Sequence, residues 1–494
     1  MFIKKRSNIL YRDFHTFGYL TDNRNFGYKL KNANEGFVGD KIVSQSGAIF
    51  LSALSGKPQK IDDIASKINN VFPSVDFIYI KENAIDFFSS LEKDGFVIIG
   101  DTIQECNEKD TRFSYRDVVS KYSSVLTTKL VEYSVKSTQE FFDNYFENQP
   151  QLTNIHIEIT SRCNERCIHC YIPSNNRKFE IDPSAFESII RQCKEMNVLH
   201  LTISGGEPMS HRNFIDFIKM CREYEFSINV LSNLTMLTDE IVDEMRLNYL
   251  LGVQVSLYSM KSAVHDEITG IKGSFDKTKK SILKLVENNI PLQIACPILK
   301  NNKSCYQDVV DWASSLNVSS GTDYVVLAKY DHSTDNLSCR LSIEEVESVL
   351  RKTFSNYKGI PRKNKNDLLG SDELLYENNV CNVCYSSVCI NEKGNVYPCA
   401  GWQDYVVGNV KSSPLKEIWF SSERVKYLRG MRRRDFPKCI QCSDREYCTM
   451  CLVRNANEEH SGDPLVVNPY YCAVAKLKKE ILTSGDPAFG EGGS

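Results

Sequence analysis

The chain has 494 residues, of which 41% are hydrophobic, and its formal net charge is −3 at pH 7. This length predicts more than one domain, and the nearly balanced charge argues against a general binder of nucleic acid or anionic membranes. No apolar signal segment follows Met1 and no run approaches the length of a membrane-spanning helix, so we expect a cytoplasmic protein. Thiols stay reduced there, and the 18 cysteines therefore indicate metal or redox chemistry rather than disulfides.

Residues 1–100 contain no cysteine and read as a separate module. Alternating aromatic and polar residues over 11–31, around the polar segment 22–25, predict a β-hairpin. Amphipathic patterns and a short apolar run predict three helices and a returning strand, at residues 44–54, 61–71, 84–93 and 96–99.

This order resembles the winged-helix module that recognises leader peptides in ribosomal-peptide modification systems, and S-G-A-I-F-L-S-A-L-S-G-K-P-Q-K-I-D-D-I-A-S-K-I at residues 46–68 resembles its helical core. The resemblance implies that an edge strand of the hairpin takes up a peptide by strand addition. A DNA-binding winged helix is the alternative. It is disfavoured because the second and third helices lack a dense Arg/Lys face.

Residues 101–150 form a polar bridge that is mostly helical in pattern, notably at 137–146. A disordered linker is the alternative reading of this bridge. Its many aromatic residues argue against that alternative, because disordered segments contain few of them.

From residue 151 to about 335, short apolar strands alternate with helical patterns. Such repeats build a parallel sheet, and six of them make a partial (β/α)6 TIM barrel, so the expected fold class is α/β. Active sites of such barrels lie at the carboxyl ends of the strands. We expect strands at residues 155–159, 199–203, 228–231, 253–257, 292–295 and 324–327.

Three cysteines, Cys163, Cys167 and Cys170, follow the first of these strands. Thiolate ligands select zinc, copper(I) or iron–sulfur clusters. A structural zinc site would need a fourth ligand, for which only His169 is near in the sequence. Three thiolates can instead hold three irons of a [4Fe–4S] cluster and leave one iron open to a ligand.

The spacing C-x3-C-x2-C followed by the aromatic Tyr171 resembles the signature of the radical S-adenosylmethionine (SAM) enzymes. The resemblance implies that the open iron chelates the amino and carboxylate groups of SAM, and that reductive cleavage of SAM yields a 5′-deoxyadenosyl radical. It also implies an external electron donor such as flavodoxin or ferredoxin.

Further cofactor contacts are expected after the second strand, where Gly205, Gly206, Glu207 and Pro208 form a G-G-E-P motif. The glycines let the backbone approach a ligand closely, and the carboxylate can accept from an ammonium group. In the family that this chain resembles, the motif binds the methionine amino group.

The third and fourth strands also end in polar residues. Ser232, Asn233 and Ser256 resemble the ribose or carboxylate contacts of the family, although Leu234 stands where the family has glycine. His265 and Asp266 invite an acid–base reading, but a helix start explains them structurally. No catalytic acid or base is assigned.

After a linker at 336–380, the nine cysteines between Cys381 and Cys472 mark a cysteine-rich domain at 381–480, followed by a glycine-rich tail at 481–494. Their order resembles the SPASM extension, which carries auxiliary [4Fe–4S] clusters. The resemblance implies one cluster on Cys381, Cys384 or Cys389, Cys399 and Cys451 and a second on Cys439, Cys442, Cys448 and Cys472.

The cysteine-rich domain departs from the family pattern in two ways. Cys448 and Cys451 are separated by two residues, where the family usually has three. Three thiols also stand upstream where two would suffice, and we expect Cys389 rather than Cys384 to be the surplus one, because its apolar neighbours predict a buried strand. A zinc ribbon is the alternative for this domain, since C-x2-C pairs also bind zinc.

The sequence therefore predicts a radical SAM peptide maturase that binds the leader of a precursor peptide at residues 1–100, with no nucleic acid or membrane as partner. Thioether formation is the favoured reaction. Carbon–carbon cross-linking and sulfatase-type maturation are alternatives within the class. A non-catalytic DNA-binding iron–sulfur or zinc sensor is the alternative outside it, although a sensor has no need of the G-G-E-P motif.

Overall fold

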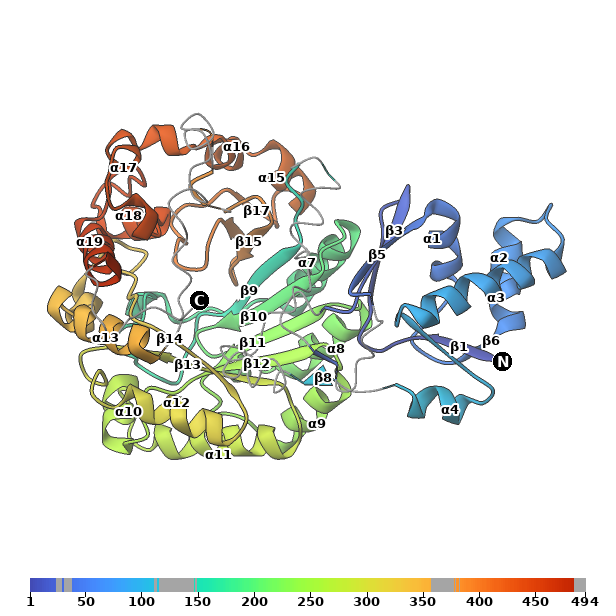
Figure 1. The fold of residues 1–494 in the computed structure, drawn as a ribbon, viewed down its shortest axis with the longest axis horizontal. Coiled ribbons are helices and arrows are strands. Elements are labelled where there is room, and N and C mark those ends of the chain that lie inside the picture. The colour runs from blue at the N-terminus through green and yellow to red at the C-terminus, as the bar shows by residue number, and fades with distance from the viewer. Residues whose placement is uncertain are drawn as a thin grey trace, which may run out of the picture.

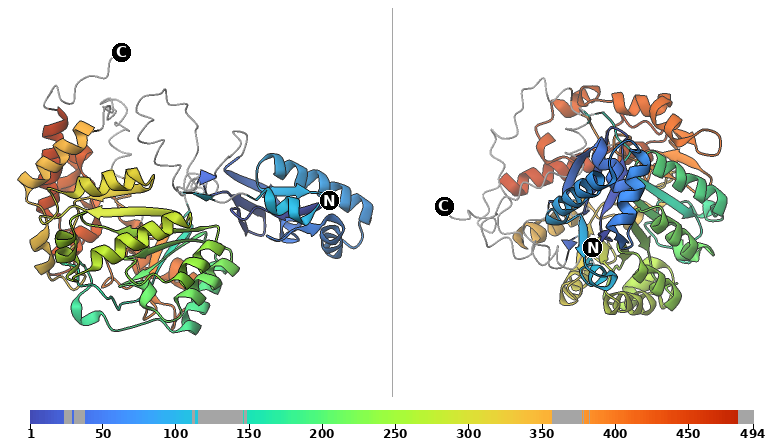
Figure 2. Two further views of the ribbon diagram at one scale, coloured as in Figure 1. Left: turned by 90° about the horizontal axis from the view of Figure 1, so that it is seen from below. Right: turned by 90° about the vertical axis from the view of Figure 1, so that its right-hand side faces the viewer.

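The computed structural model describes residues 1–23, 29–30, 38–110, 113–114, 146, 149–356, 377, 379–381 and 383–483. An N-terminal module, a central parallel sheet flanked by helices and a cysteine-rich region follow one another along the chain (Figure 1). The module projects from one end of the central body (Figure 2). The helix predicted at 137–146 lies outside the described residues except for residue 146, as does the tail after residue 483.

The N-terminal hairpin turns earlier than its sequence pattern predicts. Strands β2 (Leu10–Asp13) and β3 (Phe17–Thr21) pair antiparallel with Asp13 opposite Gly18. The turn of this hairpin therefore lies at residues 14–16, and residues 24 and 25 of the predicted turn lie outside the described residues. The aromatic alternation is misleading here because Phe14 and Phe17 stack on each other across the turn, with ring centroids 4.8 Å apart.

Strand β5 (Asp40–Ser44) joins β3, which gives the sheet order β2-β3-β5. The helices that follow are α1 (Gln45–Ser52), α2 (Ile61–Val71) and α3 (Phe77–Lys93), which confirms the three predicted helices. Helix α3 begins earlier than predicted because the Asp76 carboxylate accepts from the backbone N–H groups of Ile78 and Tyr79.

The returning strand β7 (Val97–Gly100) is confirmed, and it pairs with β1 (Phe2–Lys5), which the sequence analysis did not predict. Strand β6 (Gln59–Lys60) lies on the other side of β1. The helix α4 (Ile103–Glu108) and the pair of short strands β4 (Lys29–Leu30) and β8 (Phe113–Ser114) complete the described part of this end of the chain.

The central sheet is parallel from β9 to β14, as predicted. Its strands are β9 (Asn154–Thr160), β10 (His200–Gly205), β11 (Ser227–Ser232), β12 (Leu251–Ser256), β13 (Leu292–Pro297) and β14 (Ser319–Asp323). The connecting helices are α7 (Pro183–Glu195), α8 (Phe214–Glu223), α9 (Asp239–Leu247), α10 (Ser262–Thr269), α11 (Ser274–Glu287) and α12 (Tyr306–Ser315).

The sixth strand does not lie at 324–327, where the apolar alternation predicts it. Strand β14 instead precedes that segment and is built from small polar residues, because it is an edge strand whose outer half is exposed. The apolar residues of 324–327 are buried for a different reason. Val326 packs in a satellite cluster with Tyr258 and Leu299, outside any strand.

The sheet continues beyond the six parallel strands. Strand β15 (Ser387–Ile390) pairs parallel to β9, and β16 (Asn395–Tyr397) and β17 (Gly408–Asn409) extend it further. The buried strand expected around Cys389 is thereby confirmed. The cysteine-rich region is thus joined to the barrel by one continuous sheet, a connection that the sequence analysis did not predict.

Helix α13 (Ile343–Asn356) lies within the predicted linker. The cysteine-rich region contains α15 (Leu415–Ser421), α16 (Glu423–Gly430), α17 (Pro437–Ile440), α18 (Leu452–Glu458) and α19 (Pro469–Thr483). Helix α19 enters the first residues of the predicted tail. Within the described ranges, every helix is too short or too polar to cross a membrane.

The N-terminal module packs on the barrel through one face of its sheet. Leu10, Phe17 and Tyr19 form a small core with Leu199 and Leu250, which directly precede β10 and β12. The fully buried Arg12 guanidinium donates to the backbone carbonyls of Val198 and Glu225, both at 2.8 Å. The module therefore sits at the amino ends of the barrel strands.

Candidate functional site

The loop that carries Cys163, Cys167 and Cys170 begins where β9 ends, at the carboxyl edge of the sheet. The Glu165 N–H donates to Cys163 Sγ at 3.4 Å, and the Cys170 N–H donates to the Cys167 carbonyl at 3.2 Å, so the loop folds back tightly. Burial raises the pKa of Cys163 to about 12 and that of Cys167 well above its ordinary value. The thiolate forms therefore need a bound cation to stabilise them.

The three thiols fit a cubane better than a single metal ion. In the described ranges, no group of three His, Cys, Asp or Glu side chains converges on one ion position, as zinc would require. A [4Fe–4S] cluster binds each thiolate through a different iron. The His169 Nε2 lies 3.4 Å from the Tyr258 hydroxyl, and the His169 ring packs against the Tyr258 ring.

The two glycines after β10 let this strand approach the cysteine loop. A Cβ on Gly205 would lie 2.0 Å from the Thr160 carbonyl oxygen, and one on Gly206 would lie 2.1 Å from the Arg162 carbonyl oxygen. The N–H groups of Gly206 and Glu207 donate to these same carbonyls at 2.7 and 2.8 Å. In the structure, the backbone at Gly205 and Gly206 therefore approaches the loop that precedes Cys163. We had expected these glycines to allow close approach to a ligand.

The Glu207 carboxylate is held by donors from the chain itself. It is fully buried and accepts from the Met209 N–H at 3.0 Å, the Ser232 hydroxyl at 2.8 Å and the Asn233 N–H at 2.8 Å. Burial raises its pKa to about 7 although these three donors lower it. The side chain thus ties the ends of β10 and β11 together. Pro208 opens the short 3-10 turn that follows.

The polar residues at the ends of β11 and β12 lie at the same edge of the sheet. The Asn233 Nδ2 donates to Asn164 Oδ1 in the cysteine loop at 2.9 Å. Leu234, where the family has glycine, is buried and adopts a left-handed φ of 60°, the conformation that glycine adopts without strain. Ser256 is half-buried in the last position of β12. Tyr171 lies at the end of the cysteine loop, and its carbonyl accepts from the Tyr330 N–H at 3.2 Å.

His265 and Asp266 lie inside α10 rather than at its start, so the predicted helix start is wrong for this pair. The Asp266 carboxylate accepts from the N–H groups of Gly273 and Phe275, at 2.6 and 2.9 Å, and from the Ser274 hydroxyl, so it organises the start of α11. His265 Nδ1 accepts from the Tyr258 N–H at 3.3 Å.

The first predicted set of auxiliary ligands comes together across the gap in sequence. The Cys384 thiol lies close enough to Cys381 and Cys399 for each to raise its pKa, and Cys399 is affected in the same way by Cys451. Cys389 lies in β15, opposite Tyr397, and its pKa is raised well above the ordinary value by burial and by the nearby thiols of Cys399 and Cys384.

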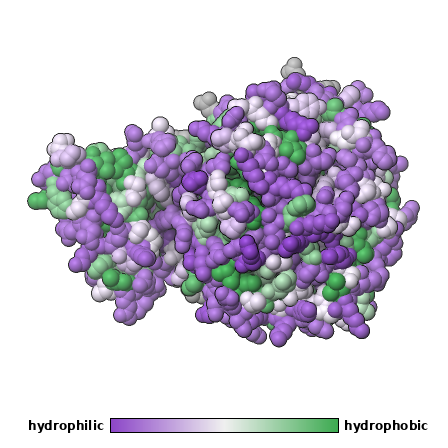
Figure 3. Space-filling model, turned by 180° about the vertical axis from the view of Figure 1, so that it is seen from behind, coloured by the Kyte–Doolittle hydropathy of each residue, from purple (hydrophilic) through white to green (hydrophobic). Residues whose placement is uncertain are grey.

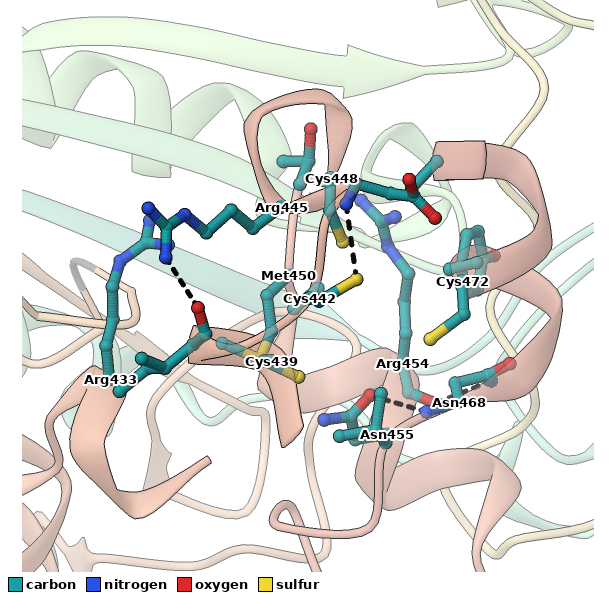
Figure 4. A pocket seen from close by; sticks show the side chains of 17 residues that line it. Arg433, Cys439, Cys442, Arg445, Cys448, Met450, Arg454, Asn455, Asn468 and Cys472 are labelled. Carbon is teal, nitrogen blue, oxygen red and sulfur yellow. Dashed lines mark hydrogen bonds between the residues drawn. The ribbon is translucent and has the colours of Figure 1, made fainter. Parts of the chain in front are cut away.

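The second predicted set lines one pocket (Figure 4). Cys439, Cys442, Cys448 and Cys472 surround it, with Arg433, Arg445 and Arg454 in its wall. Burial and the nearby thiols of Cys472 and Cys442 raise the pKa of Cys448, and Arg454 and Lys478 offset part of this rise.

Glu158 is a site residue that the sequence analysis missed. It is buried in β9, and its Oε2 accepts from the Gln403 side-chain amide of the cysteine-rich region. Burial raises its pKa to about 8, with Tyr397 and Tyr171 close by. A carboxylate inside the otherwise apolar strand I-H-I-E-I was the signal that could have identified it.

Two protein families match the chain. Residues 157–313 match the Radical SAM superfamily, and residues 381–444 match SPASM, an iron-sulfur cluster-binding domain.

Similar proteins include the AdoMet-dependent heme synthase of Methanosarcina barkeri, 24% identical over 354 residues that cover 67% of this chain and 99% of that protein. Another is the antilisterial bacteriocin subtilosin biosynthesis protein AlbA of Bacillus subtilis, 25% identical over 316 residues that cover 61% of this chain and 68% of AlbA. The crystal structure of Streptococcus suis SuiB bound to precursor peptide SuiA shares the fold, with a TM-score of 0.58 and 15% identity over 95% of this chain and 100% of that chain.

The motif loop at the carboxyl edge of a parallel sheet, the cysteine sets beyond it and the two family matches agree with one another. SAM, a radical SAM [4Fe–4S] cluster and auxiliary [4Fe–4S] clusters are the cofactors that these two domains imply. The chain is an enzyme with a radical SAM domain at residues 157–313 and a SPASM domain at residues 381–444.

Proposed function

We propose that this enzyme cross-links a ribosomally made precursor peptide, with a thioether between a cysteine sulfur and a carbon as the favoured product. Forming that bond would remove a hydrogen atom from carbon, taken up by the 5′-deoxyadenosyl radical, and a proton from sulfur, while the remaining electron would pass to an auxiliary cluster. The observation that carries the proposal is a groove beside β5, which is an edge strand among the strands that the structure describes, on a module fixed to the same chain's barrel.

The open edge belongs to β5. The Asp22 N–H donates to the Gly39 carbonyl at 2.9 Å. Hydrogen-bonded pairs alternate along an antiparallel ladder, so the register makes Lys41 and Val43 the residues of β5 that are hydrogen-bonded to β3. The N–H and C=O groups of Ile42 then point away from β3, toward the free edge. Strand β2 does not offer such an edge, because its Arg12 is docked on the barrel. The expected strand addition therefore moves from the hairpin to β5.

The groove continues from this edge between α1 and α3. Gly47 and Phe50 of α1 and Tyr79, Ile80 and Phe87 of α3 are among its lining residues. Tyr79 is 61% exposed and the adjacent Ile78 is 64% exposed. Apolar side chains also show on the surface of the module when the molecule is seen from behind (Figure 3). An extended peptide with apolar side chains fits such a surface.

We assign Cys163, Cys167 and Cys170 as ligands of the radical SAM cluster, which supplies the electron that cleaves SAM to a 5′-deoxyadenosyl radical. The backbone at Gly205 and Gly206, with Ser232, Asn233 and Ser256, would hold SAM at the same edge. Two auxiliary clusters would occupy the two cysteine sets of the SPASM region, and a flavodoxin or ferredoxin would supply electrons.

A heme synthase is among the similar proteins, but that match covers 67% of this chain, whereas the fold shared with SuiB covers 95%. SuiB was crystallised with a precursor peptide, and AlbA is a bacteriocin biosynthesis protein. These relatives support a peptide substrate. A carbon–carbon cross-link is the alternative product, and sulfatase-type maturation is disfavoured because it has no need of the N-terminal groove.

The test uses the short peptide encoded beside the gene, incubated anaerobically with reconstituted enzyme, SAM and reductant. We expect the peptide mass to fall by two hydrogens per cross-link, and Tyr79→Ala to weaken peptide binding at least tenfold. Tyr427→Ala is the matched control, because Tyr427 is also exposed, at 52%, but lies on α16. Unchanged peptide mass, or equal binding by the Tyr79→Ala and Tyr427→Ala enzymes, would contradict the proposal.

A further inference from the structure

The groove and the cofactor motifs lie at opposite ends of the barrel. The sheet β2-β3-β5 has two faces: Phe17 and Tyr19 pack on the barrel, whereas Leu20 and Val43 belong to the core of the helices. The groove between α1 and α3 is on the helix side of this sheet, away from the barrel (Figure 1).

The described contacts between the barrel side of the module and the barrel are made by the segments that enter the strands. Val198, Leu199, Glu225 and Leu250 make these contacts, and each stands directly before a strand or at the turn that leads into one. Cys163, Gly206 and Ser232 stand at the other end, after or at the end of β9, β10 and β11. A peptide bound in the groove must therefore extend along the full height of the barrel for its modified residues to reach the carboxyl edge, where the radical would form.

The distance that the peptide must span follows from strand geometry. Strands β9 to β12 have six or seven residues, which at about 3.3 Å per residue makes the sheet about 20 Å high. The module's own sheet adds a layer of about 10 Å between the barrel and the groove. An extended peptide covers at most about 3.3–3.6 Å per residue, so about 30 Å requires about nine residues.

Resting on the proposed function, we propose that the substrate is a two-part peptide in which at least about nine residues separate the segment bound in the groove from the residues that are modified. The spacer passes outside the barrel from its amino to its carboxyl edge. A peptide with a shorter spacer would still bind in the groove, but its modified residues would not reach the radical. A peptide with a longer spacer can do both at once.

The fixed position of the module makes this limit sharp. Arg12 donates to carbonyls on both sides of the interface, and Lys5 pairs with Glu225 at 2.6 Å. Asn197 Nδ2 also donates to the Asp13 carbonyl at 2.9 Å. The module cannot swing toward the carboxyl edge without breaking these contacts, so the spacer rather than the module must cover the distance.

The experiment uses the peptide encoded beside the gene, rebuilt with Gly/Ser spacers of about four, seven, ten and fifteen residues between its binding segment and its modified residues. We expect the four peptides to bind with the same affinity within a factor of two. We expect the modification rate to fall at least tenfold between the ten- and seven-residue spacers and to reach background at four. Equal modification rates at four and fifteen residues would overturn the inference.

Transfer between enzyme molecules is tested by mixing two variants. Tyr79→Ala impairs the groove and leaves the cysteine loop intact, whereas Cys167→Ala does the reverse. Their mixture should not modify the fifteen-residue peptide above the sum of the separate variants, and restored modification would overturn the claim that the spacer acts within one chain. If no spacer length gives a modified product, the proposed function fails. A length-independent rate leaves that function standing and removes only this inference.

Discussion

Gly206→Ala should impair SAM cleavage although the added methyl group touches neither cysteine nor cofactor. The new Cβ would lie 2.1 Å from the Arg162 carbonyl oxygen, whereas ordinary contacts begin at 3.4 Å, so the backbone must separate by about 1.3 Å. Arg162 directly precedes Cys163, and the displacement therefore reaches the cysteine loop. A misplacement of about 1 Å near a reacting group costs about 100-fold in rate.

The assay measures 5′-deoxyadenosine formed from SAM and a chemical reductant without peptide, together with iron content. We expect Gly206→Ala to lower the rate by about 100-fold. The matched control is Gly430→Ala, because a Cβ at Gly430 meets nothing within 4 Å, and its rate should stay at the parent value. Parent-like cleavage by Gly206→Ala would refute the reasoning that these glycines position the cysteine loop.

Three further predictions concern other parts of the chain. Cys389→Ala should keep the iron content, whereas Cys399→Ala should lower it by up to about four irons per chain, measured by iron analysis after anaerobic reconstitution; equal losses in both would contradict the assignment of Cys389 as surplus. Because burial raises the pKa of Glu158 to about 8 from its ordinary 4.5, the folded chain binds the extra proton, so stability should fall as pH rises from about 4.5 to about 8. Glu158→Gln should flatten that part of the pH dependence in denaturant melts, and identical slopes would argue against a protonated Glu158. Arg12→Met should remove the hydrogen bonds to the carbonyls of Tyr11, Val198 and Glu225, each worth about 1.5–3 kcal/mol. We expect the module to be released from the barrel, which small-angle scattering would detect as an increased radius of gyration. An unchanged radius of gyration would show that other contacts hold the module.

Much of the barrel could be predicted because its signals are local. Apolar runs place strands β9 to β13 within a few residues of their observed bounds, and the capping side chain of Ser44 marks the start of α1. The cysteine spacing identifies the motif loop without any tertiary information. The strand at Cys389 is likewise visible from its apolar neighbours.

The failures arise where tertiary contacts decide. Strand β14 is polar because it is an exposed edge, and the apolar segment after it is buried by a loop cluster instead. The role of Glu207 could not be predicted, because its three donors come from the next turn and from the following strand. Neither the joining of β15 to β9 nor the docking of Arg12 leaves a local pattern, since each depends on residues far apart in the sequence.

The account rests most directly on the three cysteines of the motif loop. The decisive measurement is 5′-deoxyadenosine formation and iron content in anaerobically reconstituted Cys167→Ala, compared with Cys221→Ala, a buried cysteine of α8 outside the predicted ligand sets. We expect Cys167→Ala to form no 5′-deoxyadenosine and to lose up to about four of about twelve irons, while Cys221→Ala keeps both. Cleavage of SAM at the parent rate by Cys167→Ala would contradict the central claim.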